Sequence, residues 1–154
     1  MFNGFSPIYD KESRILILGS FPSVISRKVD FYYGNARNRF WSMMETLYDV
    51  KLVTTQEKIQ FLRDNHIALW DIVDSCEIQG SQDSKISQYK VNDLSQILSF
   101  AKIEKILCNG KTAYDITTQN NNNIETKIIY MQSTSPANPR FDIKGWADEL
   151  ESKY

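Results

Sequence analysis

The sequence predicts an α/β protein: a three-layer sandwich with a central, mainly parallel four-stranded sheet flanked by helices. Short apolar runs alternate with longer segments of helical periodicity, the pattern of parallel strands joined by crossover helices. At 154 residues the chain has the length of one domain. No internal repeat or linker divides the sequence, so we expect a single domain over residues 1–154.

Four apolar runs are the predicted strands. Residues 14–18 form a continuous run of Ile and Leu, typical of a strand buried on both faces. The other predicted strands are 67–70, 103–108 and 126–131. Right-handed crossovers would place the loops that follow these strands along one edge of the sheet.

Helices are predicted between the strands. Over 36–48 apolar residues recur at helical spacing, with Asn35 or Asn38 as the N-cap. The residues from Thr54 to Glu57 form a capping-box sequence, which opens a helix that ends at Asp64 and Asn65.

Three more helices are expected towards the C-terminus: one that Asn92 caps, a short one around 113–116, and one that presents Ile143, Trp146 and Leu150. Two polar stretches are expected to lack regular structure. Residues 76–90 are predicted to be an irregular connection, and residues 119–123 a solvated excursion.

Composition excludes several classes of protein. Two cysteines and one histidine are too few for a disulfide framework, a standard zinc site or an iron–sulfur cluster, so we predict no metal and no cofactor. No run approaches the ~20 apolar residues that span a bilayer, and the N-terminus lacks the features of a signal peptide. We therefore expect a cytoplasmic protein without a membrane partner.

Charge is informative only locally. The net charge of −1 argues neither for nor against a nucleic-acid partner. The segment from Arg27 to Arg39 nevertheless holds four basic residues against Asp30 alone. This segment is either a solvated basic loop or part of an anion-binding surface.

Two catalytic patterns are incomplete. The Asn109–Thr112 segment resembles the end of a phosphate-binding loop, but Lys105 stands where that motif needs its first glycine. A serine nucleophile would need a histidine, and His66 is expected at the amino end of the second strand, away from the loops. We therefore predict neither an NTPase nor a serine hydrolase.

Polar segments follow three of the predicted strands, at Gly19–Ser23, Asn109–Thr112 and Ser133–Pro139, and a fourth, Phe31–Trp41, can reach the same rim. Ligands of open α/β sheets bind in the crevice at the carboxyl ends of the strands. Tyr33, an aromatic residue in a basic loop, suits stacking on a nucleobase, which is worth ~1–3 kcal/mol.

Together these segments resemble the uracil-DNA glycosylase superfamily, and most closely its hypoxanthine (deoxyinosine) DNA glycosylase branch. The resemblance spans nearly the whole chain. Its five ordered motifs are Leu18–Ser23, Tyr32–Trp41, Ala68–Cys76 followed by Gly80–Ser84, Asn109–Tyr114, and Ser133–Asn138.

The resemblance implies a monofunctional DNA N-glycosylase that flips a deaminated base, hypoxanthine or uracil, out of double-stranded DNA in base-excision repair. It implies a monomer without a cofactor. It assigns catalysis to Asn38 and Ser20, base binding to Phe21, Tyr33 and Asn109, and DNA binding to Arg37, Arg39, Ser133, Ser135, Pro136, Ala137, Asn138 and Arg140.

Some alternatives stay open at this point. Asn38 could orient a water molecule, hydrogen-bond the base, or simply cap a helix. Ser23 stands where many relatives have glycine, and the Ser133–Asn138 segment lacks the histidine of other branches. Lys111 is the one candidate for lyase chemistry. Two other functions are a catalytically inactive DNA-binding module of this fold and a nucleotide-binding protein unrelated to DNA.

Overall fold

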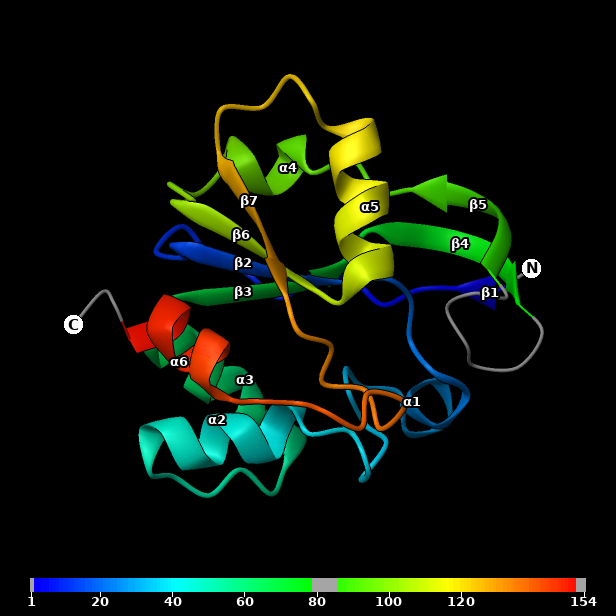
Figure 1. Ribbon diagram of the computed structural model, residues 1–154. Coiled ribbons are helices and arrows are strands. Elements are labelled where there is room, and N and C mark those ends of the chain that lie inside the picture. The colour runs from blue at the N-terminus through cyan, green and yellow to red at the C-terminus, as the bar shows by residue number, and fades with distance from the viewer. Residues whose placement is uncertain (1, 79–85, 152–154) are drawn as a thin grey trace.

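The computed structural model describes residues 2–78 and 86–151. Its central sheet has four parallel strands in the order β3-β2-β6-β7 (Figure 1). These are β2 (Ile15–Gly19), β3 (Ile67–Asp71), β6 (Lys105–Asn109) and β7 (Lys127–Met131). Each predicted strand forms, with ends that shift by one or two residues, and the predicted fold class is confirmed.

Helices cover both faces of this sheet. On one face lie α4 (Ser95–Leu98) and α5 (Lys111–Asn120), and on the other lie α2 (Phe40–Tyr48), α3 (Thr55–Asp64) and α6 (Lys144–Glu151) (Figure 1). Because β2 lies between β3 and β6 and is covered on both faces, all five of its residues are buried.

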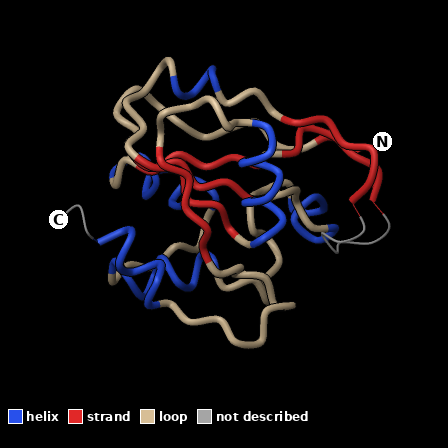
Figure 2. The backbone as a smooth tube through the Cα atoms, turned by 45° about the horizontal axis from the view of Figure 1, so that its top comes forward, coloured by secondary structure: helices blue, strands red, loops and turns tan. Residues whose placement is uncertain are grey.

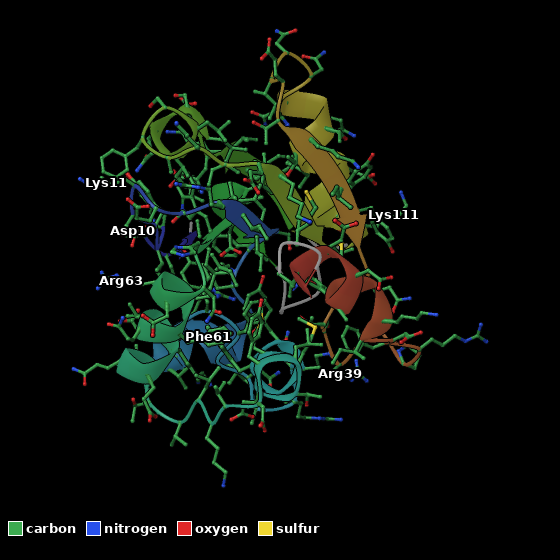
Figure 3. The ribbon with its side chains drawn as sticks, turned by 90° about the vertical axis from the view of Figure 1, so that its left-hand side faces the viewer. Asp10, Lys11, Arg39, Phe61, Arg63 and Lys111 are labelled. Atoms are coloured by element: carbon green, nitrogen blue, oxygen red, sulfur yellow. The ribbon has the colours of Figure 1, made fainter. Side chains whose placement is uncertain are left out.

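Helix α3 begins as its sequence predicts. Thr54 accepts the N–H of Glu57 at 3.1 Å, and the Glu57 carboxylate accepts the N–H of Thr54 at 2.8 Å. Backbone hydrogen bonds from Thr54 and Val53 lower the pKa of Glu57. Along the same helix, Phe61 points inward towards α2 while Arg63 points outward (Figure 3).

The prediction for residues 76–90 is wrong at both ends. A second, antiparallel sheet is built from β1 (Phe2–Asn3), β4 (Val73–Ile78) and β5 (Ile86–Val91), in the order β1-β4-β5. It extends from the end of β3 away from the main sheet (Figure 2). Backbone hydrogen bonds pair these largely polar strands, so apolar periodicity gives no signal for them. Residues 79–85, with most of the Gly80–Ser84 motif, lie outside the described part.

Three predictions about helix ends are also wrong. Helix α4 begins at Ser95 with Leu94 at the N-cap, whereas Asn92 donates its Nδ2–H to the carbonyl of Asp71 at 2.7 Å. Helix α5 is longer than predicted and includes residues 119 and 120, because helical hydrogen bonding extends through the polar residues. Helix α2 starts at Phe40 rather than at residue 36.

Two observations concern the classes of protein that the sequence analysis excluded. His66 precedes β3 and lies at the amino-terminal edge of the sheet, as predicted. In residues 2–78 and 86–151, no helix is long and apolar enough to cross a membrane, and no group of three His, Cys, Asp or Glu side chains could hold a metal ion.

Candidate active site

The candidate site lies where the winding of the sheet reverses. The chain passes from β2 to β3 on one side and later builds β6 and β7 on the other, so the switch point lies between β2 and β6. The loops after β2, β6 and β7 meet at the carboxyl ends of the strands, beside the segment between α1 (Val24–Val29) and α2 (Figure 1). They enclose a cavity of about 540 Å³, a size typical of ligand sites.

Most of the predicted site residues line this cavity. Those that do are Ser20, Phe21, Tyr33, Asn38, Asn109, Ser133, Ser135, Pro136, Ala137 and Asn138. Arg37, Arg39 and Arg140 are not among the lining residues, and Arg37 and Arg140 are exposed. The structure thus brings Tyr33 and Asn38 to the same cavity as Ser20 and Ser135.

Three of the lining residues, Gly19, Tyr33 and Asp71, lie close together at the carboxyl end of β2, and we call this group the pocket floor. A Cβ on Gly19 would lie 2.5 Å from Oδ1 of Asp71 and 3.0 Å from the hydroxyl oxygen of Tyr33. Only a glycine leaves room for these two groups at the end of β2.

Asp71 is a site residue that the sequence interpretation missed. It ends β3 in register with Gly19, and it lines the cavity although it is only 4% exposed. A signal was available in the sequence, because Asp71 directly follows a predicted strand at the edge where the loops gather.

Tyr33 is held in a conformation that few residues adopt. Its φ is 52°, in the left-handed region that usually costs a non-glycine residue energy, and such strain is retained where the surroundings fix the backbone. One face of its ring stacks on Phe40, with centroids 4.2 Å apart and planes inclined by 23°.

The neighbouring Tyr32 anchors this segment in the core. Its hydroxyl donates to the carbonyl of Ser6 at 2.7 Å, and its own carbonyl accepts the indole N–H of Trp41 at 2.8 Å. Burial raises the pKa of Tyr32, and the nearby Asp71 and Tyr33 raise it further. Tyr32 therefore stays protonated, and Tyr33 is the more exposed of the two tyrosines at the cavity.

Asn38 combines a structural contact with unused donors. Its Oδ1 accepts the N–H of Phe40 at 2.9 Å, so it binds the first residue of α2 although Arg39 occupies the N-cap position. This hydrogen bond identifies which end of the amide is oxygen. Its Nδ2 donors form no hydrogen bond with the described residues, and the half-buried side chain lines the cavity.

Asn109 joins two of the loops. Its carboxamide donates to Oγ1 of Thr134 at 3.0 Å and accepts the N–H of Thr134 at 2.9 Å. Both residues are buried. The nitrogen and the oxygen of the Asn109 amide thus both bind Thr134 already. The predicted contact of Asn109 with a base would have to be made in addition to these two hydrogen bonds.

Arg39 binds the segment of residues 133–140, which we call the 133–140 loop. Its guanidinium donates from one nitrogen to the carbonyls of Ser135, at 3.1 Å, and Asn138, at 2.9 Å. Its backbone N–H donates to the carbonyl of Thr134 at 3.0 Å. Figure 3 shows Arg39 beside the segment that leads into α6. The guanidinium also lies 5.4 Å from the ring centroid of Phe141.

The 133–140 loop also has internal hydrogen bonds. Ser133 Oγ accepts the N–H of Ser135 at 3.1 Å, and Ser135 Oγ accepts the N–H of Ala137 at 3.1 Å. Asn138 donates its Nδ2–H to the carbonyl of Ser133 at 3.0 Å. Pro136 and Ala137 are exposed at its tip.

Lys111 lies at the rim and carries its charge in an ion pair. Its Nζ is 2.8 Å from Oδ2 of Asp115 one turn along α5, and this partner raises the pKa of Lys111. An ammonium group with a raised pKa is protonated near neutral pH and is a poor nucleophile.

Comparisons with known proteins find similarity to DNA glycosylases. The family model of the uracil DNA glycosylase superfamily matches residues 6–148. The chain is 36% identical to the hypoxanthine DNA glycosylase of Methanosarcina acetivorans, over 98% of this chain and 96% of that protein. It is 33% identical to the hypoxanthine DNA glycosylase of Methanosarcina barkeri, over 96% of this chain and 97% of that protein.

A solved structure agrees with these sequence matches. The solution NMR structure of a proposed uracil DNA glycosylase from Methanosarcina acetivorans superimposes with a TM-score of 0.79 at 34% identity. The match covers 97% of this chain and 94% of that one.

Proposed function

The chain belongs to the uracil DNA glycosylase superfamily, as its motifs predict, and on this premise we propose that it is a DNA N-glycosylase that removes hypoxanthine, and also uracil, from double-stranded DNA. One observation carries the proposal. An aromatic ring, Tyr33, and a carboxamide, Asn38, line the same cavity as Ser20 and Ser135 at the switch point of the sheet. Such a cavity can receive one extruded base.

The reaction is a hydrolysis. The bond from C1′ of deoxyribose to the base nitrogen breaks, and its electron pair leaves with the base. Water adds its oxygen to C1′ and gives up a proton, and the departing base takes up a proton. An enzyme must therefore stabilise positive charge on the sugar and negative charge on the base.

Asn38 is proposed to act through its Nδ2 donors. Because its Oδ1 already accepts the Phe40 N–H, the two N–H groups are the part of the amide left to bind an electronegative atom of the leaving base. This favours base stabilisation over water orientation for Asn38. The capping contact and the catalytic role coexist, since they use different ends of one amide.

Other residues would hold the base. The open face of Tyr33 would stack on it, opposite the face that Phe40 covers. The turn at Ser20 and Phe21 would bring backbone amides to the negative charge that develops on the base, as in an oxyanion hole.

The 133–140 loop and exposed arginines would bind the DNA. Ser133, Ser135, Pro136, Ala137 and Asn138 form the rim that would enter the groove beside the lesion, and Arg37 and Arg140 would contact phosphates. We propose that the chain acts as a monomer, as the resemblance to the family implies.

Lyase chemistry is not part of the proposal. A Schiff base on the sugar needs an unprotonated amine, and Lys111 is held protonated by Asp115. The product is then an intact strand that carries an abasic site.

The test is an excision assay on a labelled duplex with a single hypoxanthine or uracil. We expect strand scission only after alkali, and expect Asn38→Ala to abolish most of it. Scission without alkali would contradict the monofunctional assignment. DNA binding without any alkali-labile site would support the inactive binding module instead, which the glycosylase relatives do not favour.

A further inference from the structure

Ser26 is a buried serine at the wall of the cavity. It lies in α1, the short helix that follows the loop after β2, and it lines the cavity although it is only 3% exposed. The proposed reaction uses Ser20 and Phe21 of the preceding loop but gives Ser26 no task.

The hydroxyl of Ser26 joins two segments of the site. Its Oγ accepts the backbone N–H of Gly34 at 2.9 Å, directly after Tyr33. It also accepts the hydroxyl of Ser23, the N-cap of α1, at 3.1 Å, while Ser23 Oγ accepts the backbone N–H of Ser26 at 3.1 Å. Ser26 thus connects the loop after β2 with the segment that carries Tyr33.

These contacts fix the backbone on one side of Tyr33. The φ and ψ of a residue are the rotations between two rigid peptide planes, one before it and one after it. The plane before Tyr33 is held at the carbonyl of Tyr32, which accepts the indole N–H of Trp41 at 2.8 Å. The plane after Tyr33 is held at the N–H of Gly34 by Ser26. The two hydrogen bonds together define the left-handed conformation of Tyr33.

Packing keeps the same segment against α1. The backbone N–H of Phe31 donates to the carbonyl of Ser26 at 3.2 Å. A Cβ on Gly34 would overlap Cγ2 of Val29 and lie 3.4 Å from Cα of Ser26. The chain therefore contacts α1 both before and after Tyr33.

The position of the Tyr33 ring depends on this conformation. A tyrosine with a φ of 52° is strained, and it returns to a negative φ when its surroundings no longer hold it. Rotation of the backbone at Tyr33 would move its side chain away from Phe40, on which the ring now stacks. The ring would then no longer present its open face to the cavity.

We propose that Ser26 is a positioning residue, whose hydroxyl holds the peptide between Tyr33 and Gly34 so that the Tyr33 ring is oriented for stacking before DNA binds. The inference rests on the proposed function, in which Tyr33 stacks on the extruded base. Ser26 acts only through Tyr33 and makes no contact with the base.

A double-mutant cycle tests this dependence on Tyr33. Excision of hypoxanthine is measured under single-turnover conditions at saturating enzyme for the wild type, Ser26→Ala, Tyr33→Leu and the double variant. Ser26→Ala should lower the rate by about tenfold in the wild type, the upper end of the effect of one hydrogen bond. In the Tyr33→Leu background it should lower the rate by less than about twofold, because residues that act as a unit are not additive.

The matched control is Ser13→Ala. Ser13 is 2% exposed, its Oγ accepts the backbone N–H of Asp10 at 3.1 Å, and it is not among the residues that line the cavity. Ser13→Ala should lower the thermal stability about as much as Ser26→Ala but leave the excision rate at the wild-type value. Equal loss of rate in the two serine variants, or equal loss from Ser26→Ala in both backgrounds, would overturn the inference.

A second measurement does not depend on activity. A positive φ brings the amide and α protons of one residue close together, which gives a strong nuclear Overhauser effect between them. We expect this signal at Tyr33 in the wild type and in Ser13→Ala, and its loss in Ser26→Ala. An unchanged signal in Ser26→Ala would contradict the inference even if the wild type released no base, the result that would refute the proposed function itself.

If Ser26→Ala does not fold, Ser26→Cys takes its place in both measurements. Sulfur is only a weak acceptor, so the cysteine variant also loses the hold on the N–H of Gly34 while a small side chain stays in the buried site. The expected and the contradicting results are the same as for Ser26→Ala.

Discussion

The two sides of the cavity are held in different ways. The 133–140 loop is fixed by hydrogen bonds. Arg39 donates to three of its carbonyls, and Asn109 donates to the hydroxyl of Thr134 and accepts its backbone N–H. At the pocket floor close packing adds a constraint of its own, with Gly19 leaving room for Asp71 and Tyr33 stacked on Phe40.

This difference separates two tasks. A hydrogen-bonded loop can be loosened by the loss of a single partner while the pocket floor keeps its packing. A packed floor fails when any atom is added or moved, because interiors tolerate little extra volume. We therefore expect variants of the 133–140 loop to lower the affinity for DNA, and variants of the pocket floor to lower the rate of base excision.

The largest effect is expected at Asn38, which lies between the two sides. Asn38→Ala removes the donors assigned to the leaving base, and loss of one such donor costs about 10²- to 10³-fold in rate. Loss of its contact to Phe40 should cost only about 0.5–2 kcal/mol of stability. Single-turnover excision and thermal unfolding measure the two.

The control for this variant is Asn120→Ala, which also removes a hydrogen bond between an asparagine side chain and a helix backbone, here from Nδ2–H to the carbonyl of Ile116, away from the cavity. It should leave the excision rate at the wild-type value. Equal loss of rate in both variants would show that Asn38 acts through stability alone.

The second-largest effect is expected from a methyl group added to the pocket floor. Gly19→Ala places a Cβ 2.5 Å from Asp71 and 3.0 Å from Tyr33, so one of them must move. A displacement of about 1 Å at a reacting centre can cost 10²-fold in rate. Gly145→Ala adds the same atom in α6 where nothing lies within 4 Å, and should stabilise the protein by about 0.5–1 kcal/mol. An active Gly19→Ala variant would show that the floor is not packed as described.

Tyr33 tests the stacking role of the floor. Tyr33→Leu should slow excision by about 10- to 100-fold, the equivalent of ~1–3 kcal/mol for one stacked base. Tyr33→Phe keeps the ring and should keep most of the rate. The comparison is made at saturating enzyme, and identical rates for the leucine and phenylalanine variants would exclude a stacking role.

The smallest effect is expected from the 133–140 loop. Arg39→Met removes hydrogen bonds to Ser135 and Asn138 and should weaken lesion binding, while the dependence of log K on log salt keeps its slope. Arg140→Met should instead reduce that slope by about 0.9, as expected for one lost phosphate contact. Titrations at several salt concentrations distinguish the two, and a changed slope for Arg39→Met would mean that its charge contacts DNA directly.

The sequence predicted the parallel sheet because β2, β3 and most of β6 are buried and therefore consist of apolar runs, and β7, although partly exposed, is apolar as well. It did not predict β4 and β5, whose pairing depends on backbone hydrogen bonds between polar segments. Tyr33 and Asn38 could be placed at the cavity because they lie in a motif that reaches the strand ends.

The contacts made by Arg39 could not be predicted in the same way. Its partners Ser135 and Asn138 lie 96 and 99 residues further along the chain, so no local pattern reports them. The sequence predicted a DNA contact for Arg39, whereas in the folded chain its guanidinium binds the 133–140 loop, and the salt dependence of the Arg39→Met variant tests which role it has. Asp71 was missed although it directly follows a predicted strand, because its position beside Gly19 depends on the register between two strands that lie far apart in the sequence.

The central claim is that one base leaves the duplex and enters the cavity beside Tyr33 and Asn38. Its most direct test uses the Asn38→Ala variant and a duplex with the fluorescent base 2-aminopurine next to hypoxanthine. We predict that binding raises the fluorescence, because extrusion of hypoxanthine unstacks its neighbour. Tight binding of the lesion duplex with unchanged fluorescence would contradict the claim.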